Sequence, residues 1–129
     1  MVIGLGNDLI EIARVAKAAK KERFLEKYFA EEEIAYWKER GSRAETLAGL
    51  FAGKEAAAKA LGTGFLGFWP KEIVILHEES GAPYLVLKGG AQAVYEKRNG
   101  GRFLLSISHN KTDAMAVAIL EEREGGERR

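Results

Sequence analysis

The sequence predicts an α+β fold in which a small antiparallel or mixed sheet packs against helices. Helical apolar spacing fills most of the first half of the chain, and alternating apolar residues fill most of the second half. No repeat or linker interrupts the 129 residues, and a hydrophobic content of 47% suits one moderate core. We therefore expect a single domain over residues 1–122 and a frayed or disordered charged tail over residues 123–129.

The N-terminal half is expected to form one strand and three helices. Residues 1–9 alternate as a strand does, so that Gly4, Gly6 and Asp8 share one face. The second helix begins with acidic residues, and the third is rich in alanine and ends in glycines. The three helices are predicted over residues 14–28, 31–40 and 44–61.

The C-terminal half is expected to form two hairpins with a short helix between them. Ser-Gly-Ala-Pro joins the strands of the first hairpin, and His-Asn-Lys-Thr-Asp joins those of the second. Asn-Gly-Gly ends the helix. The strands are predicted over residues 72–78, 84–88, 103–108 and 114–120, and the helix over residues 91–98.

Composition excludes several classes of protein. The chain has 20 lysines and arginines against 19 acidic residues, so it lacks the positive field of a general nucleic-acid binder. It has no cysteine, which excludes disulfides and thiolate zinc sites, and its two histidines disfavour a histidine-rich metal site. No charged leader opens the chain, and no apolar stretch approaches the roughly 20 residues that span a bilayer. We expect a cytoplasmic protein without a membrane or nucleic-acid partner.

The third predicted helix presents charged residues. Lys54 falls within its apolar stripe, and Glu55 and Lys59, four residues apart, lie along the margin. Together with Asp8, Glu55 gives the pair of carboxylates that suits Mg²⁺ or Mn²⁺, and Lys59 could neutralise a phosphate on the same metal. The alternatives are an ordinary Glu55–Lys59 surface ion pair and a simple turn role for Asp8.

The histidines differ in their sequence context. His109 follows a strand beside Ser106 and Ser108, so it is a candidate partner of a phosphate or hydroxyl group. The alternative is an ordinary surface histidine. His77 lies on an apolar strand face, which favours a structural role. The sequence contains neither a phosphate-binding loop nor a dinucleotide fingerprint.

The first predicted helix is basic and carries interleaved aromatic residues. Such a run is often a solvated helix face. The alternative function is a docking surface for an acidic protein, in which charges steer the encounter and aromatic rings form the buried contacts. The candidate docking residues are Arg14, Lys17, Lys21, Phe24 and Tyr28.

Three segments, taken together, resemble the motifs of the bacterial holo-acyl-carrier-protein synthases, the short 4′-phosphopantetheinyl transferases. The segments are Gly4–Arg14, which begins Gly-Leu-Gly-Asn-Asp; Phe51–Gly64, which contains Lys-Glu-Ala-Ala-Ala-Lys; and Ser106–His109. They occur in the family's order between about residue 1 and residue 122, and residues 81–84 also resemble the family's Gly-Lys-Pro segment.

This resemblance implies transfer of 4′-phosphopantetheine from coenzyme A to a serine of apo acyl carrier protein, in support of fatty acid biosynthesis. Adenosine 3′,5′-bisphosphate is the other product. Asp8 and Glu55 match the metal ligands of the family, and Lys59 matches its phosphate-binding lysine. The resemblance also implies a phosphopantetheinyl-transferase-like homotrimer with coenzyme A between neighbouring subunits. The residues expected at coenzyme A are Lys54, Lys59, Gly62, Ser108, His109 and Arg43.

Two questions stay open on the sequence. The proton of the attacking hydroxyl could pass to Glu55, to Asp8 or to a metal-bound water. Leu50 stands where the family usually has an arginine, so a cationic contact is missing there, and Arg43 or Lys54 is the candidate substitute. The alternative functions are another metal-dependent phosphohydrolase or nuclease, and a homologue that binds carrier proteins without catalysing transfer.

Overall fold

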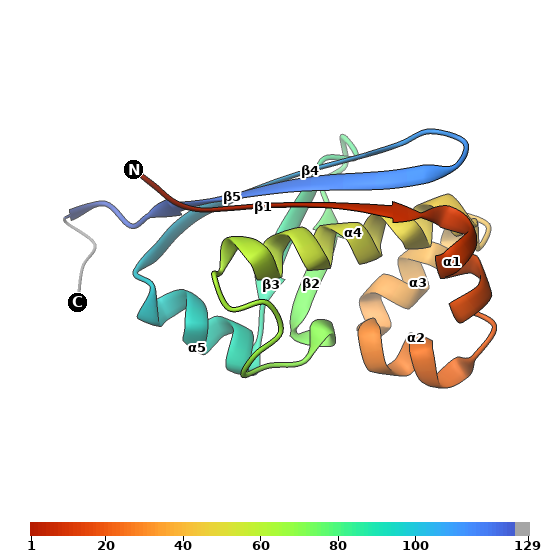
Figure 1. Ribbon diagram of the computed structural model, residues 1–129, viewed down its shortest axis with the longest axis horizontal. Helices are drawn as coiled ribbons and strands as arrows, with labels where there is room; N and C mark the ends of the chain where they lie inside the picture. Colours follow the sequence, from red (N-terminus) through yellow and green to blue (C-terminus); the bar gives the residue numbers. More distant parts are fainter. Residues whose placement is uncertain (126–129) are drawn as a thin grey trace.

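The computed structural model describes residues 1–125 and has the predicted α+β architecture. Figure 1 shows the long helix α4 beneath a three-stranded sheet, with α1–α3 at one end and α5 at the other. The elements in chain order are β1 (Val2–Glu11), α1 (Ile12–Ala18), α2 (Glu22–Tyr28), α3 (Glu31–Glu39), α4 (Ala44–Ala60), a 3₁₀ turn η1 (Pro70–Glu72), β2 (Ile73–His77), β3 (Pro83–Leu87), α5 (Gly89–Lys97), β4 (Gly100–His109) and β5 (Asp113–Glu122).

The strands form two antiparallel sheets. The larger has the order β1-β5-β4, and the smaller is the hairpin β2–β3. Both predicted hairpins are therefore confirmed. Strand β1 continues to Glu11, so Asp8 lies within the strand instead of at its end.

The first predicted helix is wrong in one respect, because residues 14–28 form two helices and not one. Val15 and Phe24 are nine residues apart, which places them on opposite sides of a continuous helix. The chain bends at Lys21, whose backbone is extended, and both side chains can then pack inward.

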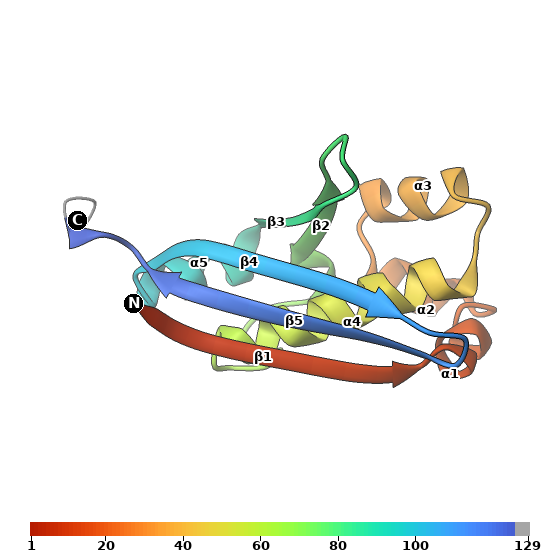
Figure 2. The same cartoon turned by 90° about the horizontal axis from the view of Figure 1, so that it is seen from above.

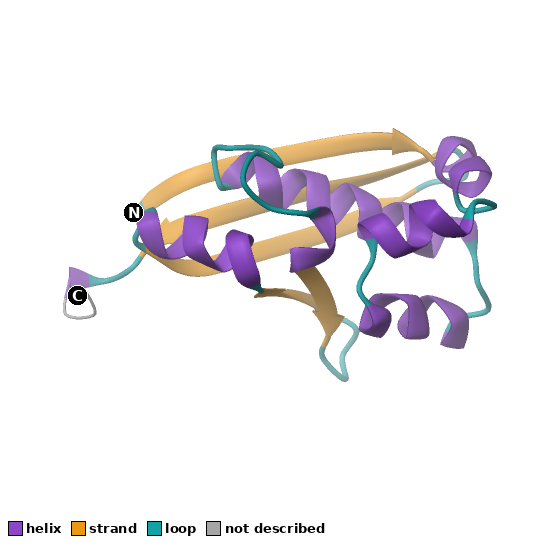
Figure 3. Cartoon of the chain, turned by 90° about the horizontal axis from the view of Figure 1, so that it is seen from below, coloured by secondary structure: helices purple, strands orange, loops and turns teal. Residues whose placement is uncertain are grey.

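Helix α4 packs on the larger sheet through small residues. Ala52, Ala56 and Ala60 are fully buried, as are Ala116 and Ala118 on β5, the central strand. Figure 3, seen from below, shows α4 running along the strands. Figure 2 shows the opposite face of this sheet, which no helix of the described part of the chain covers. The core thus lies on one side of the sheet only.

The end of the described chain is tied to α5. Arg123 donates its backbone N–H to the carbonyl of Asn99 and pairs with Glu96 at 2.7 Å. The rest of the predicted charged tail, residues 126–129, lies outside the described residues. Within residues 1–125, no helix has both the length and the apolar character needed to cross a membrane.

Candidate active site

Glycines on β1 allow this strand to lie directly on α4. A Cβ atom at Gly4 would sit 1.9 Å from the carbonyl oxygen of Ala60, and one at Gly6 would sit 2.0 Å from that of Ala56. Any side chain at these positions would separate the strand from the helix. The next residue on the same strand face is Asp8, which is thereby brought beside α4.

Asp8, Glu55 and Lys59 form what we call the carboxylate cluster. The ammonium of Lys59 donates to the backbone carbonyl of Asn7 at 2.8 Å and lies 3.5 Å from Asp8 Oδ1. The Lys59 side chain is 51% exposed and that of Asp8 is 16% exposed, so the cluster is open to a ligand on one side.

The electrostatics of this cluster favour a cation. Burial raises the pKa of Glu55, the neighbouring Asp8 carboxylate raises it further, and Lys59 opposes both effects. Two acids that repel each other gain from a shared divalent ion. Within the described residues, no three or more histidine, cysteine and acidic side chains are placed to hold a metal ion together, so a metal at this cluster would take two carboxylates. That number fits Mg²⁺, which completes its shell with water and phosphate oxygens.

Lys54, expected at coenzyme A, is instead buried in the core. Its side chain is 1% exposed and pairs with Glu33 at 2.6 Å. It also donates to the carbonyls of Pro70 at 3.0 Å and Ile73 at 2.5 Å. The ammonium thus has no donor directed at the surface, and the assignment of Lys54 to the coenzyme is withdrawn.

Glu33 was not identified by sequence reasoning, although it completes this buried network. Its two carboxylate oxygens accept the backbone N–H groups of Ala30 and Ile75, each at 2.9 Å. Burial lowers the pKa of Lys54 and raises the pKa of Glu33, and their pairing opposes both shifts. The acidic start of α3 signals a helix N-terminus in the sequence, but nothing there indicates the partner on α4.

His109 lies in a separate depression that we call the histidine hollow, of about 190 Å³. It lies between α3, α4, the β2–β3 hairpin and the end of β4. Both histidines of the chain line it, together with Leu50, at which the motif resemblance led us to expect an arginine. Its walls include Tyr36, Leu50, His77, Gly81, Pro83 and His109.

The other expected coenzyme residues lie in different places. Arg43 is exposed at the start of α4, and Gly62 is exposed just beyond its end, with a φ of +87° that favours glycine. Ser108 pairs with Met115 on the uncovered face of the sheet, opposite to the face that packs on α4. Arg43, Gly62 and Ser108 therefore do not lie together at one site of a single chain.

The carboxylate cluster and the histidine hollow lie on opposite flanks of α4. Gly6 of β1 packs against the Lys59 side of the helix, whereas Gly49 and Gly53 face Ile107 of β4. Strands β1 and β4 are separated by β5, a distance of about 10 Å at the usual strand spacing.

The candidate docking residues form a charged and aromatic surface at one end of the molecule. Arg14, Lys17 and Lys21 are exposed on and after α1. The rings of Phe24 and Tyr28 are half-buried and pack against Phe51 of α4, with centroids 6.1 and 5.4 Å away. Since Phe51 is one turn before Glu55, this surface borders the carboxylate cluster.

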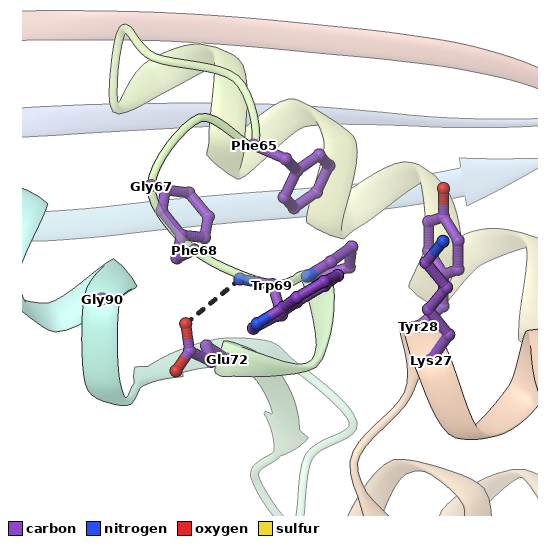
Figure 4. A pocket seen from close by; sticks show the side chains of 9 residues that line it. Lys27, Tyr28, Phe65, Gly67, Phe68, Trp69, Glu72 and Gly90 are labelled. Atoms are coloured by element: carbon purple, nitrogen blue, oxygen red, sulfur yellow. Dashed lines mark hydrogen bonds between the residues drawn. The ribbon is translucent and has the colours of Figure 1, made fainter.

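A larger pocket of about 590 Å³ adjoins this surface, and Figure 4 shows its walls. Tyr28 and Lys27 come from α2, and Phe65, Phe68 and Trp69 come from the loop after α4. The Trp69 side chain is 60% exposed, and its backbone N–H donates to Glu72 at 3.1 Å. The glycine-rich loop after α4 thus supplies the aromatic wall of this pocket.

Comparison with known proteins identifies the class. Residues 4–118 match the model of the 4′-phosphopantetheinyl transferase superfamily. The chain therefore belongs to this superfamily.

The individual relatives described next are named holo-[acyl-carrier-protein] synthases. A holo-[acyl-carrier-protein] synthase of Clostridium perfringens is 47% identical over 126 residues, which cover 94% of this chain and 95% of that protein. The Helicobacter pylori holo-[acyl-carrier-protein] synthase, solved in complex with coenzyme A, is 32% identical with a TM-score of 0.81, covering 91% of this chain and 99% of that one. The Neisseria meningitidis synthase is 29% identical with a TM-score of 0.87, covering 95% and 100%. The resemblance found in the motifs is confirmed, and the chain is an enzyme of the phosphopantetheinyl transferase class.

Proposed function

We propose that this enzyme transfers 4′-phosphopantetheine from coenzyme A to a serine of apo acyl carrier protein, with Mg²⁺ as its cofactor. The observation that carries the proposal is the carboxylate cluster, in which β1 and α4 bring two acids and a lysine together. The relatives are named for this reaction, and a solved one holds coenzyme A. Because the named acceptor is the acyl carrier protein, the proposal extends to fatty acid biosynthesis in the cytoplasm.

The chain's own residues have distinct parts in this reaction. Asp8 and Glu55 would hold Mg²⁺ or Mn²⁺, which when bound supplies positive charge for the pyrophosphate oxygens. Lys59, anchored by the carbonyl of Asn7, directs its ammonium toward the same space and stabilises charge that develops on the leaving phosphate. His109 would contact coenzyme A from the histidine hollow.

The carrier protein would dock on the basic surface of α1 and α2. Arg14, Lys17 and Lys21 would steer an acidic partner, and Phe24 and Tyr28 would give it an apolar contact beside α4. This placement delivers the acceptor serine to the helix flank that carries Glu55.

We further propose a homotrimer with coenzyme A between subunits. The cluster and the hollow lie on opposite flanks of α4, so a coenzyme that uses both types of contact would bridge two chains. The uncovered sheet face carries exposed apolar side chains, with Leu5 66% and Leu9 70% exposed, which suits burial in an assembly. Light scattering should give three times the chain mass; a monomer that is fully active would contradict this proposal.

Mass spectrometry of the carrier tests the proposed reaction. Apo acyl carrier protein incubated with the enzyme, coenzyme A and Mg²⁺ should gain the mass of one phosphopantetheine. A carrier with its acceptor serine changed to alanine should gain nothing. Phosphate release from nucleotides without any carrier would favour a phosphohydrolase instead, and binding of the carrier without a mass gain would favour an inactive homologue.

A further inference from the structure

The histidine hollow has one wall that neither the sequence motifs nor the proposed reaction explains. Tyr36 of α3 and His77 of β2 lie face to face, with ring centroids 4.0 Å apart and an interplanar angle of 3°. The guanidinium of Arg40 covers the other face of Tyr36, 4.8 Å from its centroid. The result is a three-layer stack between a helix and a hairpin.

His77 is placed where it controls the hairpin turn. It is the last residue of β2 and pairs across the hairpin with Pro83, the first residue of β3. The turn between them is closed by hydrogen bonds between Glu78 and Ala82 and between Gly81 and Glu78, each at 2.9 Å. Fixing the ring of His77 therefore fixes the position of the whole turn.

The stack is suited to a neutral, rigid contact. Burial lowers the pKa of His77, and the Arg40 guanidinium lowers it further. Its Nδ1 atom is buried and makes no hydrogen bond within the described residues. Ring stacking on Tyr36 therefore orients the imidazole, whose buried Nδ1 atom has no polar partner within the described residues.

The turn held in this way lines the histidine hollow. Gly81 and Pro83 line this hollow together with His109. Figure 2 shows the β2–β3 hairpin projecting beside α3, away from the larger sheet, so its tip has few other supports. The distance between the turn and His109 therefore depends on how the hairpin is anchored to α3.

We propose that Tyr36 and His77 are positioning residues for coenzyme A. Their stack sets the Gly81–Pro83 turn beside His109 and so fixes the width of the hollow in which His109 meets the coenzyme. This inference rests on the proposed function, since it assumes that coenzyme A uses the hollow. It assigns His77 a positioning role for coenzyme A, beyond the structural role that the sequence favoured.

Leucine and phenylalanine variants test this proposal. Tyr36→Leu and His77→Leu should raise the KM and the Kd for coenzyme A about tenfold or more, with kcat changed less than about threefold. Tyr36→Phe and His77→Phe keep a flat ring and should restore values near those of the wild type.

Tyr95→Leu is the matched control. Tyr95 stacks on Phe103 at the far end of β4, with centroids 6.4 Å apart and an interplanar angle of 5°. Its loss should lower the melting temperature without changing the KM for coenzyme A. Wild-type KM and Kd in both leucine variants at the stack, or an equal rise in Tyr95→Leu, would overturn the inference. If the wild type binds coenzyme A but transfers nothing, the proposed function fails while the Kd series still decides the role of the stack.

Discussion

Lys54, which pairs with Glu33 in the core, and Lys59 of the open carboxylate cluster lie on the same helix, α4, yet their charges have opposite environments. The Lys54 ammonium pairs with Glu33 and donates hydrogen bonds to two backbone carbonyls, and its side chain is 1% exposed. Lys59, five residues later, has one backbone partner and a side chain that is 51% exposed. Packing around α4, and not residue type, therefore separates a structural lysine from one that is available to a ligand.

Removing Lys54 should cause the largest effect on stability. Lys54→Met leaves the Glu33 carboxylate buried without its partner, so we expect a loss of about 3 to 5 kcal/mol in the free energy of unfolding. Urea denaturation measures this loss. Lys59→Met, at a half-exposed site, serves as the comparison and should lose less than about 1 kcal/mol in the free energy of unfolding. If Lys54→Met kept wild-type stability but lost its affinity for coenzyme A, the division between the two lysines would be wrong.

Removing Lys59 should instead lower the rate of the transfer reaction. Lys59→Met takes away a preorganised positive charge, for which we expect kcat to fall about 10²- to 10³-fold. Steady-state transfer assays give kcat, and the melting temperature of the same sample serves as the control. An unchanged kcat would remove Lys59 from the reaction.

Leu50 lies on the other flank of α4, in the wall of the histidine hollow. Leu50 is apolar and 2% exposed, and the Lys54 ammonium is paired with Glu33 in the core. Neither residue therefore supplies a cationic contact in the histidine hollow. We expect discrimination between coenzyme A and its dephospho form to be about tenfold weaker than in a relative with arginine at this position. The ratio of kcat/KM for the two substrates measures it, and equal or stronger discrimination would contradict the expectation.

The pH dependence of stability should show a smaller effect that isolates Glu55. The ordinary pKa of its carboxyl group is 4.5, and the folded protein raises it. Glu55 thus contributes stability that is present below its unfolded pKa and is lost as pH rises through the folded value. Melting temperatures between about pH 4 and 8 should reveal this loss, which Mg²⁺ should offset and Glu55→Gln should abolish. A pH-independent difference between the variant and the wild type would exclude the effect.

Sequence reasoning found the fold class and the hairpins, because periodicity and local spacing determine them. It grouped Asp8 with Glu55 and Lys59 from the chemistry of their side chains and from the motif resemblance, because local spacing relates only Glu55 to Lys59. Gly4 and Gly6 leave part of one face of β1 without side chains, and the structure shows that α4 lies against this part. A helical wheel could not show that α3 and η1 would enclose Lys54, because that contact depends on tertiary packing. The Tyr36–His77 stack joins a helix to a distant strand, so local patterns carried no signal for it.

The most direct test of the account compares transfer by the wild type with transfer by Asp8→Asn and Glu55→Gln. The measurement is the initial rate of phosphopantetheine transfer to apo acyl carrier protein at saturating coenzyme A and Mg²⁺. Losing several kcal/mol of charge stabilisation should reduce the rate of either variant to below about a thousandth of the wild-type value, with the melting temperature nearly unchanged. Wild-type turnover in either variant would show that the carboxylate cluster is not the catalytic metal site.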